Sequence, residues 1–508
     1  MKRTLLVAFV AAFCALFAMA GGKAQAGLFG KPAPTATPSA SPAPIPTATP
    51  EPPNIAIPRL QAKLKSDPND RQSLVDLAQQ YLSVGHPELA IPLTQRLLQL
   101  GEKTAQVYYF DGTAQEALGQ IPNAINDLEN ASNLEPTNIG VLSTLTQLYI
   151  KTNRARDAER IANRAVTFNK ADPRAYSTLG LVYATEGKFD QARQQFDKAF
   201  ALDPKDVTPL LQEAQTFANQ KQLPAAVTTV ERALAADPKN VQVLVFRADL
   251  LAQQNDTAKA ALAYGDAVAA APDDDAKVSI SVRKAAMYAR LKQNAIADQT
   301  FQSIVTTYPK VAAAYTAYGE YLASQHNIGK AQQQFQAALA INKDEPGALL
   351  DLAELKLSGG HTSDAIGYLK HLGTVAPSAQ AFALLGQAYI ATHDYAHARQ
   401  ACSSAFQLQR SPEMLGCIAG SDYSLKNFKE ASQIFDVLDA NVKTYINQNP
   451  QLLYMMGVSY THVGQKSKAV GSYKRLLKDM KPGSKQYNDI KKMIGQLSVK
   501  TPSKKKPG

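Results

Sequence analysis

The chain has 508 residues, a formal net charge of +11, 45% hydrophobic residues and no Trp. This length supplies enough apolar residues for a large buried core. Frequent Ala, Gln and Leu and regularly spaced Pro argue against a β-rich design and favour many similar helices.

Residues 1–26 have the features of a secretory signal peptide. Lys2 and Arg3 precede an apolar run of 16 residues, 5–20, and residues 24–26 (AQA) form a small-x-small cleavage pattern. Because a membrane-spanning helix needs about 20 apolar residues, we predict cleavage after residue 26, with an uncleaved anchor as the alternative. The mature chain is expected to be soluble and exported, to the periplasm, the cell envelope or the extracellular space.

Residues 27–54 are rich in Pro, Ala and Thr, and they include the run KPAPTATPSASPAPIPTATPEPP. Few of these side chains have apolar surface to bury, so we predict a disordered segment with polyproline II character. It is interpreted either as a spacer ahead of the folded part or as a low-complexity tail.

Residues 173–206 show the pattern that dominates the rest of the chain. We count Pro173 as position 1. Apolar or small residues then stand at positions 4, 7, 8, 11, 20, 24 and 27: Tyr176, Leu179, Gly180, Tyr183, Ala192, Phe196 and Ala199. Position 32 is Pro204. Their spacings of three and four predict one apolar stripe on each of two helices. Gly187 ends the first helix, and Pro204 follows the second. We expect Gly180 and Ala192 to allow a close approach of the two backbones.

These positions are the signature of the tetratricopeptide repeat, and the segment resembles that family except that Tyr176 stands where Trp is usual. The resemblance covers roughly residues 59–499. One helix pair of this kind cannot bury both stripes and must stack on neighbours. The resemblance therefore implies an all-α, right-handed superhelical solenoid of about twelve TPR helix-turn-helix units with a C-terminal capping helix.

Twelve such units fill residues 71–483, and position 20 is Ala in every one of them. The units begin at Arg71, Ala105, Ile139, Pro173, Val207, Val241, Val278, Ala312, Pro346, Ala379, Pro412 and Pro450. Three additional residues near 271–276 and four near 441–449 are predicted to lie in turns between units. We further predict a lead-in helix within 55–70, a polar-faced capping helix at 484–499 and a basic disordered tail at 500–508.

In this family the groove is lined by the first helix of each unit, chiefly at positions 2, 5, 9, 12 and 13. Only eight of the sixty matching positions are charged: Glu116, Lys151, Arg174, Asp249, Arg290, Glu320, Glu354 and Glu413. The Lys/Asn/Arg set that clamps a peptide carboxylate in some members is missing. A groove this neutral predicts binding through polar and apolar complementarity, with weak salt dependence.

The bulkier groove residues are the candidates for partner binding: Tyr109, Leu211, Tyr423 and Tyr454. Aromatic side chains make good interface anchors. The alternative is that these side chains pack against the adjacent unit, because core and groove positions alternate closely on a helix.

The basic excess lies at one end of the chain. Residues 474–508 carry a net charge of +9, whereas the rest of the mature chain carries about −1. Such an end either attracts anionic envelope polymers or lipid headgroups, or it keeps the array soluble. Nucleic acid is not an expected partner, because no basic and aromatic residues interleave.

No Walker loop, GxSxG elbow or HExxH motif occurs, so we predict no enzyme, no catalytic residue, no cofactor and no metal. His393 and His397 lack a third ligand and are interpreted as an exposed pair. Cys402 and Cys417 occupy positions 24 and 6 of consecutive units. They form a disulfide if their Cα atoms come within about 7 Å, and otherwise they are free core thiols.

These observations predict an exported scaffold or adaptor for a protein or peptide partner. The resemblance suggests envelope assembly, secretion or polysaccharide export as its setting. One alternative is a polymer- or lipid-binding protein that acts through the basic C-terminus. The other is a cell-wall-acting enzyme, which would need a constellation of carboxylates or His in the groove.

Overall fold

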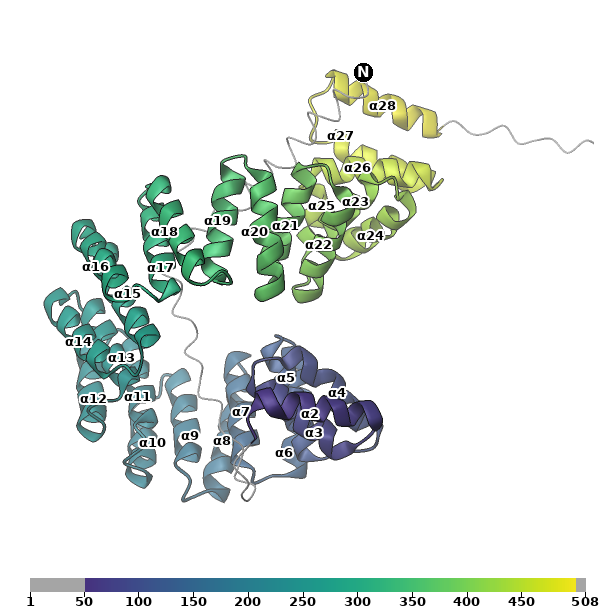
Figure 1. Ribbon diagram of the computed structural model, residues 1–508. Coiled ribbons are helices and arrows are strands. Elements are labelled where there is room, and N and C mark those ends of the chain that lie inside the picture. The colour runs from purple at the N-terminus through teal and green to yellow at the C-terminus, as the bar shows by residue number, and fades with distance from the viewer. Residues whose placement is uncertain (1–50, 499–508) are drawn as a thin grey trace, which may run out of the picture. The chain divides into compact units, whose positions relative to one another are not determined.

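The computed structural model describes residues 51–498, in which every regular element is a helix (Figure 1). The described residues form 27 helices and no strand, which confirms the all-α fold class. The predicted signal peptide, nearly all of the 27–54 linker and the 500–508 tail lie outside the described residues. Within residues 51–498, no helix is both long enough and apolar enough to cross a membrane.

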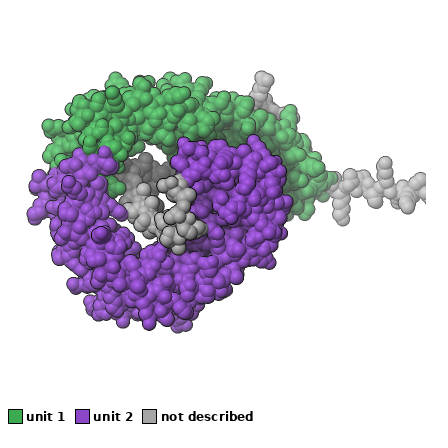
Figure 2. All heavy atoms as spheres, turned by 60° about the horizontal axis from the view of Figure 1, so that its bottom comes forward, with its two compact units in different colours: residues 1–32, 273–508 green, residues 33–272 purple. Residues whose placement is uncertain are grey.

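The chain divides into two compact units, which Figure 2 colours separately. The described part of unit 2 is residues 51–272, and that of unit 1 is residues 273–498. The division falls within 271–276, where the sequence analysis placed three additional residues.

Unit 2 contains a leading helix, α2 (Pro53–Ser66), and six helix pairs. The first helices of the pairs are α3 (Arg71–Ser83), α5 (Ala105–Ala117), α7 (Ile139–Lys151), α9 (Pro173–Thr185), α11 (Thr208–Asn219) and α13 (Val241–Gln253). The second helices are α4 (Pro87–Gln99), α6 (Ile121–Leu134), α8 (Ala155–Phe168), α10 (Phe189–Leu202), α12 (Leu223–Ala236) and α14 (Thr257–Ala270).

Unit 1 contains six further pairs, a short helix α25 (Lys443–Asn447) and a final helix α28 (Lys485–Ser498). Its first helices are α15 (Asp274–Arg290), α17 (Ala312–Ser324), α19 (Pro346–Ser358), α21 (Ala379–Ala391), α23 (Pro412–Ser424) and α26 (Pro450–His462). Its second helices are α16 (Asn294–Thr307), α18 (Ile328–Ile341), α20 (Thr362–Val375), α22 (Tyr395–Leu408), α24 (Phe428–Asn441) and α27 (Lys466–Leu477).

The two insertions do not lie in turns, so that prediction was wrong. The first lengthens α15 to 17 residues, because Asp273 caps the helix by accepting the backbone N–H of Ala276 at 2.8 Å. The second insertion forms α25, whose Ile446 is fully buried. Both added segments therefore gain helical hydrogen bonds or core contacts.

The turn inside each pair has the same backbone conformation in all twelve pairs. The residue at position 15 of every repeat has a φ between +57° and +79°. Five of these residues are Gly, and the other seven are Asn153, Lys221, Asn255, Lys292, His326, His393 and Lys426. The residue at position 16 donates its N–H to the carbonyl of the residue at position 11, as His86 does to Tyr81 at 2.8 Å. This bond ends each first helix in a Schellman turn.

The Ala at position 20 lies in the core of each pair and is at most 1% exposed in all twelve repeats. Beside it, the side chain at position 24 lies over the residue at position 8. A Cβ added to Gly180 would lie 2.7 Å from Cε1 of Phe196. At Gly180 the nearest atoms thus belong to the Phe196 ring, whereas at Gly112, the same position of another repeat, the Ala124 carbonyl oxygen would lie 3.2 Å from an added Cβ.

Within each unit the pairs stack in chain order (Figure 1). The second helix of one pair packs on the first helix of the next, as α4 does on α5 in unit 2 and α22 on α23 in unit 1. First helices also contact one another, as α7 does with α9. The leading helix α2 packs on α3, and α28 packs on α27. This nearest-neighbour packing is that of a helical solenoid.

Candidate interaction surface

The exposed side of the first helices in each unit, here called the first-helix face, holds the predicted partner-binding residues. Tyr109 and Leu211 lie on α5 and α11 of unit 2, and Tyr423 and Tyr454 lie on α23 and α26 of unit 1. All four side chains are neither fully buried nor fully exposed. Each is therefore part core and part surface.

The structure brings Tyr423 and Tyr454 together. Both pack against the core cluster at the end of unit 1, and α23 contacts α26. Burial, with smaller contributions from Tyr454 and Tyr473, raises the pKa of Tyr423 to about 12. Burial and Asp489 of α28 also raise the pKa of Tyr454. These phenols are neutral hydrogen-bonding groups at any physiological pH.

The sequence analysis missed a third tyrosine in this region, Tyr445 of α25. Its hydroxyl oxygen would lie 2.9 Å from a Cβ added to Gly416 on α23. Burial, and then the Glu413 carboxylate, raises its pKa. The four-residue insertion at 441–449 was the available signal, because it carries this side chain.

Tyr109 and Leu211 do not form a common site. They lie on first helices that belong to the second and fifth pairs of unit 2. Tyr109 packs against three core clusters that include residues of α3 to α9, and its ring lies 6.2 Å from that of Phe110. Tyr109 therefore packs partly against the core, as Tyr423 and Tyr454 do.

A group of carboxylates lies on the first-helix face of unit 1. Burial, and then Glu320 and Glu354, raises the pKa of Asp351 to about 7. Desolvation also raises the pKa of Glu320 and of Glu354, and Gln380 offsets part of the latter shift by donating to Glu354 at 3.3 Å. One carboxylate oxygen of Asp351 is buried without a hydrogen-bond partner among the described residues.

This group can accept hydrogen bonds or hold a cationic side chain. At neutral pH, Asp351 is protonated in part of the molecules. Of the three residues, only Glu320 and Glu354 stand at positions that the sequence analysis examined. Asp351 is at position 6, which the sequence pattern assigns to neither core nor groove.

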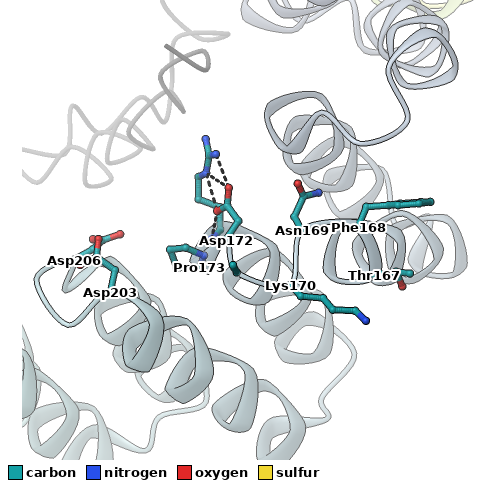
Figure 3. Close-up of a pocket in the computed structure, with 10 residues that line it drawn as sticks. Thr167, Phe168, Asn169, Lys170, Asp172, Pro173, Asp203 and Asp206 are labelled. Atoms are coloured by element: carbon teal, nitrogen blue, oxygen red, sulfur yellow. Dashed lines mark hydrogen bonds and ion pairs between the residues drawn. The ribbon is translucent and has the colours of Figure 1, made fainter.

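Unit 2 has a recess of about 830 Å³ beside the loops that join α8 to α9 and α10 to α11 (Figure 3). Phe168, which is 56% exposed, lies on one side, and Asp203 and Asp206 lie on the other. Arg174 donates to Asp172, with Nη2 and Oδ2 2.6 Å apart. The predicted groove cation Arg174 is thus already paired.

Cys402 of α22 and Cys417 of α23 are joined by a disulfide in the structure, with their Cα atoms 6.1 Å apart. Both residues are at most 2% exposed and belong to one core cluster. Gly386 of α21 makes room for Cys402, because a Cβ there would collide with its Sγ. The bond crosses from one helix pair to the next.

The pair His393 and His397 does not converge on a common point. His393 lies in the turn and contacts the Tyr395 hydroxyl at 2.9 Å, whereas His397 contacts Asp394 at 2.7 Å. Across residues 51–498, no group of three or more His, Cys, Asp or Glu is arranged to hold a metal ion.

A family model described as tetratricopeptide repeat matches residues 116–181, 183–250 and 322–388. These segments contain tetratricopeptide repeats. The matched segments lie in both units and include the Tyr and Ala positions from which the repeat was first identified.

Among known proteins, the chain is 26% identical over 148 residues to Protein O-mannosyl-transferase TMTC1 of Homo sapiens. The match covers 29% of this chain and only 17% of that protein, so the transferase activity in its name does not transfer. Yeast Tom70 is a similar solved structure, at 16% identity, 74% of this chain, 93% of that chain and a TM-score of 0.39. The APC/C hetero-tetramer Cut9–Hcn1 is another, at 15% identity, 88% of this chain, 93% of that chain and a TM-score of 0.31.

Proposed function

We propose that this tetratricopeptide-repeat protein is an exported scaffold that holds a protein or peptide partner along its first-helix face. Repeats of this family imply a protein-interaction scaffold. The observation that carries the proposal is the pairing of Tyr423 and Tyr454 on adjacent first helices, half-buried and neutral. Such side chains combine apolar contact area with a hydroxyl, which suits an interface anchor.

Export is the second part of the proposal, and two independent features support it. The first is the signal-like sequence of residues 1–26. The second is the Cys402–Cys417 disulfide, because such bonds persist in oxidising compartments and are rare in the cytosol. N-terminal sequencing of the chain from its native host tests this part, with Gly27 expected as the first residue.

The partner-binding part is tested by selecting peptides from a random displayed library on the mature chain. The Kd of the selected peptides is then compared between the wild type and the Tyr423→Ala/Tyr454→Ala variant. We expect a loss of roughly 10-fold or more, because a buried aromatic anchor contributes more than about 1.4 kcal/mol. A Tyr423→Phe/Tyr454→Phe variant keeps the packing and separates the hydroxyl contribution from an effect on folding.

Val437 of α24 provides the matched control. It is 48% exposed, belongs to unit 1 and lies on a second helix. Val437→Ala should leave the Kd within about twofold of the wild type. Equal losses in the α24 variant and in the tyrosine variant, or full affinity without both tyrosine rings, would exclude the first-helix face of α23 and α26 as the binding surface.

A further inference from the structure

The strongest electrostatic feature of the described chain is its C-terminal end. Residues 466–498, which form α27, α28 and the segment between them, contain nine Lys and Arg but only two Asp, a net charge of +7. The preceding described residues, 51–465, carry a net charge of −4. The basic end is here defined as residues 466–498.

Most of these cations have no acidic partner. Lys468 and Arg475 pair with Asp436 and Asp439 of α24, at 2.7 and 2.6 Å. The remaining seven are exposed and make no ion pair with another described residue: Lys466, Lys474, Lys478, Lys481, Lys485, Lys491 and Lys492. Their mutual repulsion is therefore not relieved within the described chain.

The apolar side chains of the basic end are used in packing. Ile490 of α28 is 5% exposed, and Met493, Ile494 and Leu497 pack against the end cluster of unit 1. No large apolar residue of 466–498 is among the exposed ones of the described chain. The basic end therefore presents charged side chains to a partner, and it has no exposed large apolar side chain that could insert between lipid tails.

The aromatic residues of the basic end do not favour nucleic acid as its partner. Tyr473 is 1% exposed and Tyr487 is partly buried, so neither presents a free ring for stacking on nucleic-acid bases. All unpaired cations of the basic end are Lys, whose ammonium is a hydrated point charge without the planar fork with which Arg grips carboxylate or phosphate in a fixed geometry. A flexible polyanion whose charged groups need no fixed hydrogen-bond geometry, such as a carboxylated polysaccharide, matches such an array.

We infer that the basic end, centred on α27 and α28, binds an acidic polysaccharide. Attraction by charge alone holds a flexible carboxylated chain against the exposed lysines of the basic end and is screened by salt. This surface borders the first-helix tyrosines, because Met493, Ile494 and Leu497 of α28 pack against the same core cluster as Tyr423 and Tyr454.

The test uses the mature full chain and alginate as the carboxylated probe, with uncharged dextran for comparison. The variant Lys485→Gln/Lys491→Gln/Lys492→Gln removes three exposed charges from α28, and Gln keeps its helix propensity. The matched control, Lys310→Gln/Lys330→Gln/Lys343→Gln, removes three exposed lysines elsewhere in unit 1 and changes the net charge equally.

At low salt we expect the α28 variant to bind alginate at least about 10-fold more weakly than the wild type, with a smaller salt dependence. The control should change the affinity by less than about twofold and dextran should not bind. Equal losses in both variants, or binding abolished by deleting residues 500–508 but unaffected in the α28 variant, would overturn the assignment. Tighter binding to phosphatidylserine vesicles or duplex DNA than to alginate would also overturn it.

Discussion

Substituting Gly180 by Ala tests how the two helices of a pair fit together. The new methyl group would lie 2.7, 2.8 and 3.0 Å from three carbons of the Phe196 ring, which is itself fully buried. Contacts this short force the ring or the helix to move. Overpacking of this kind costs about 1–3 kcal/mol, whereas the Gly→Ala change in a helix gains only about 0.5–1 kcal/mol. We therefore expect a net loss of stability of about 1 kcal/mol, with an upper bound of about 2.5 kcal/mol.

Gly265 of α14 supplies the matched control in the same unit. It lies within a helix, is exposed, and has no atom within 4 Å of an added Cβ. Gly265→Ala should therefore stabilise its helix by up to about 1 kcal/mol. The difference between the two variants isolates the overpacking between position 8 and position 24.

Native-state hydrogen exchange is the appropriate assay, because repeat arrays open locally and a single unfolding midpoint is not well defined. Exchange in α9 and α10 should accelerate for Gly180→Ala, and adding Phe196→Leu should restore part of the protection. A Gly180→Ala variant that is as stable as Gly265→Ala would refute the packing of a ring over position 8.

The remaining predictions concern a buried acid, the disulfide and the turns. Burial, and then Asp111, raises the pKa of Asp127 from 3.8 to about 6. As pH rises from about 4 to 6, the unfolded chain therefore loses this proton before the folded chain does, and the stability of the folded state falls. Asp127→Asn should thus raise the free energy of local opening of α6, measured by hydrogen exchange at pH 7, by up to about 3 kcal/mol, and it should flatten the change in this free energy between pH 4 and 7. Reducing the bond between Cys402 and Cys417, which are 15 residues apart, should lower the stability of α22–α23 by roughly 3 kcal/mol, and thiol labelling of the unreduced, denatured chain should find no free thiol at either position. Lys292→Gly should slow hydrogen exchange in α15 and α16, because a non-Gly residue at φ +60° is strained by about 1 kcal/mol.

The repeat made most of the fold predictable. The recurring Ala at position 20 and the break at Gly187 indicated which residues enter the core and where the helices end, because both follow from local spacing and helix-stop chemistry. The insertion before the seventh repeat was predicted to be a turn but lengthens α15. The sequence did not indicate that Asp273 would cap a helix that begins at Asp274. The ring over Gly180 was also missed, since it depends on the χ angles of Phe196, which spacing does not determine.

The candidate site was less predictable than the fold. The repeat assigns Tyr423 and Tyr454 to adjacent first helices, but it does not indicate how far each ring enters the core, and both pack partly against a core cluster as Tyr109 does. The environment of Asp351 depends on two neighbouring carboxylates, one of which belongs to another helix. Such properties arise only when separate repeats are brought together.

The most direct test of the central claim is photo-crosslinking of the mature chain with a library-selected peptide that carries one photoreactive residue. Crosslinks should concentrate on first helices, above all on α23 and α26 beside Tyr423 and Tyr454. Crosslinks confined to second helices such as α24, or to the lysines of α28, would contradict a scaffold that holds its partner along the first-helix face.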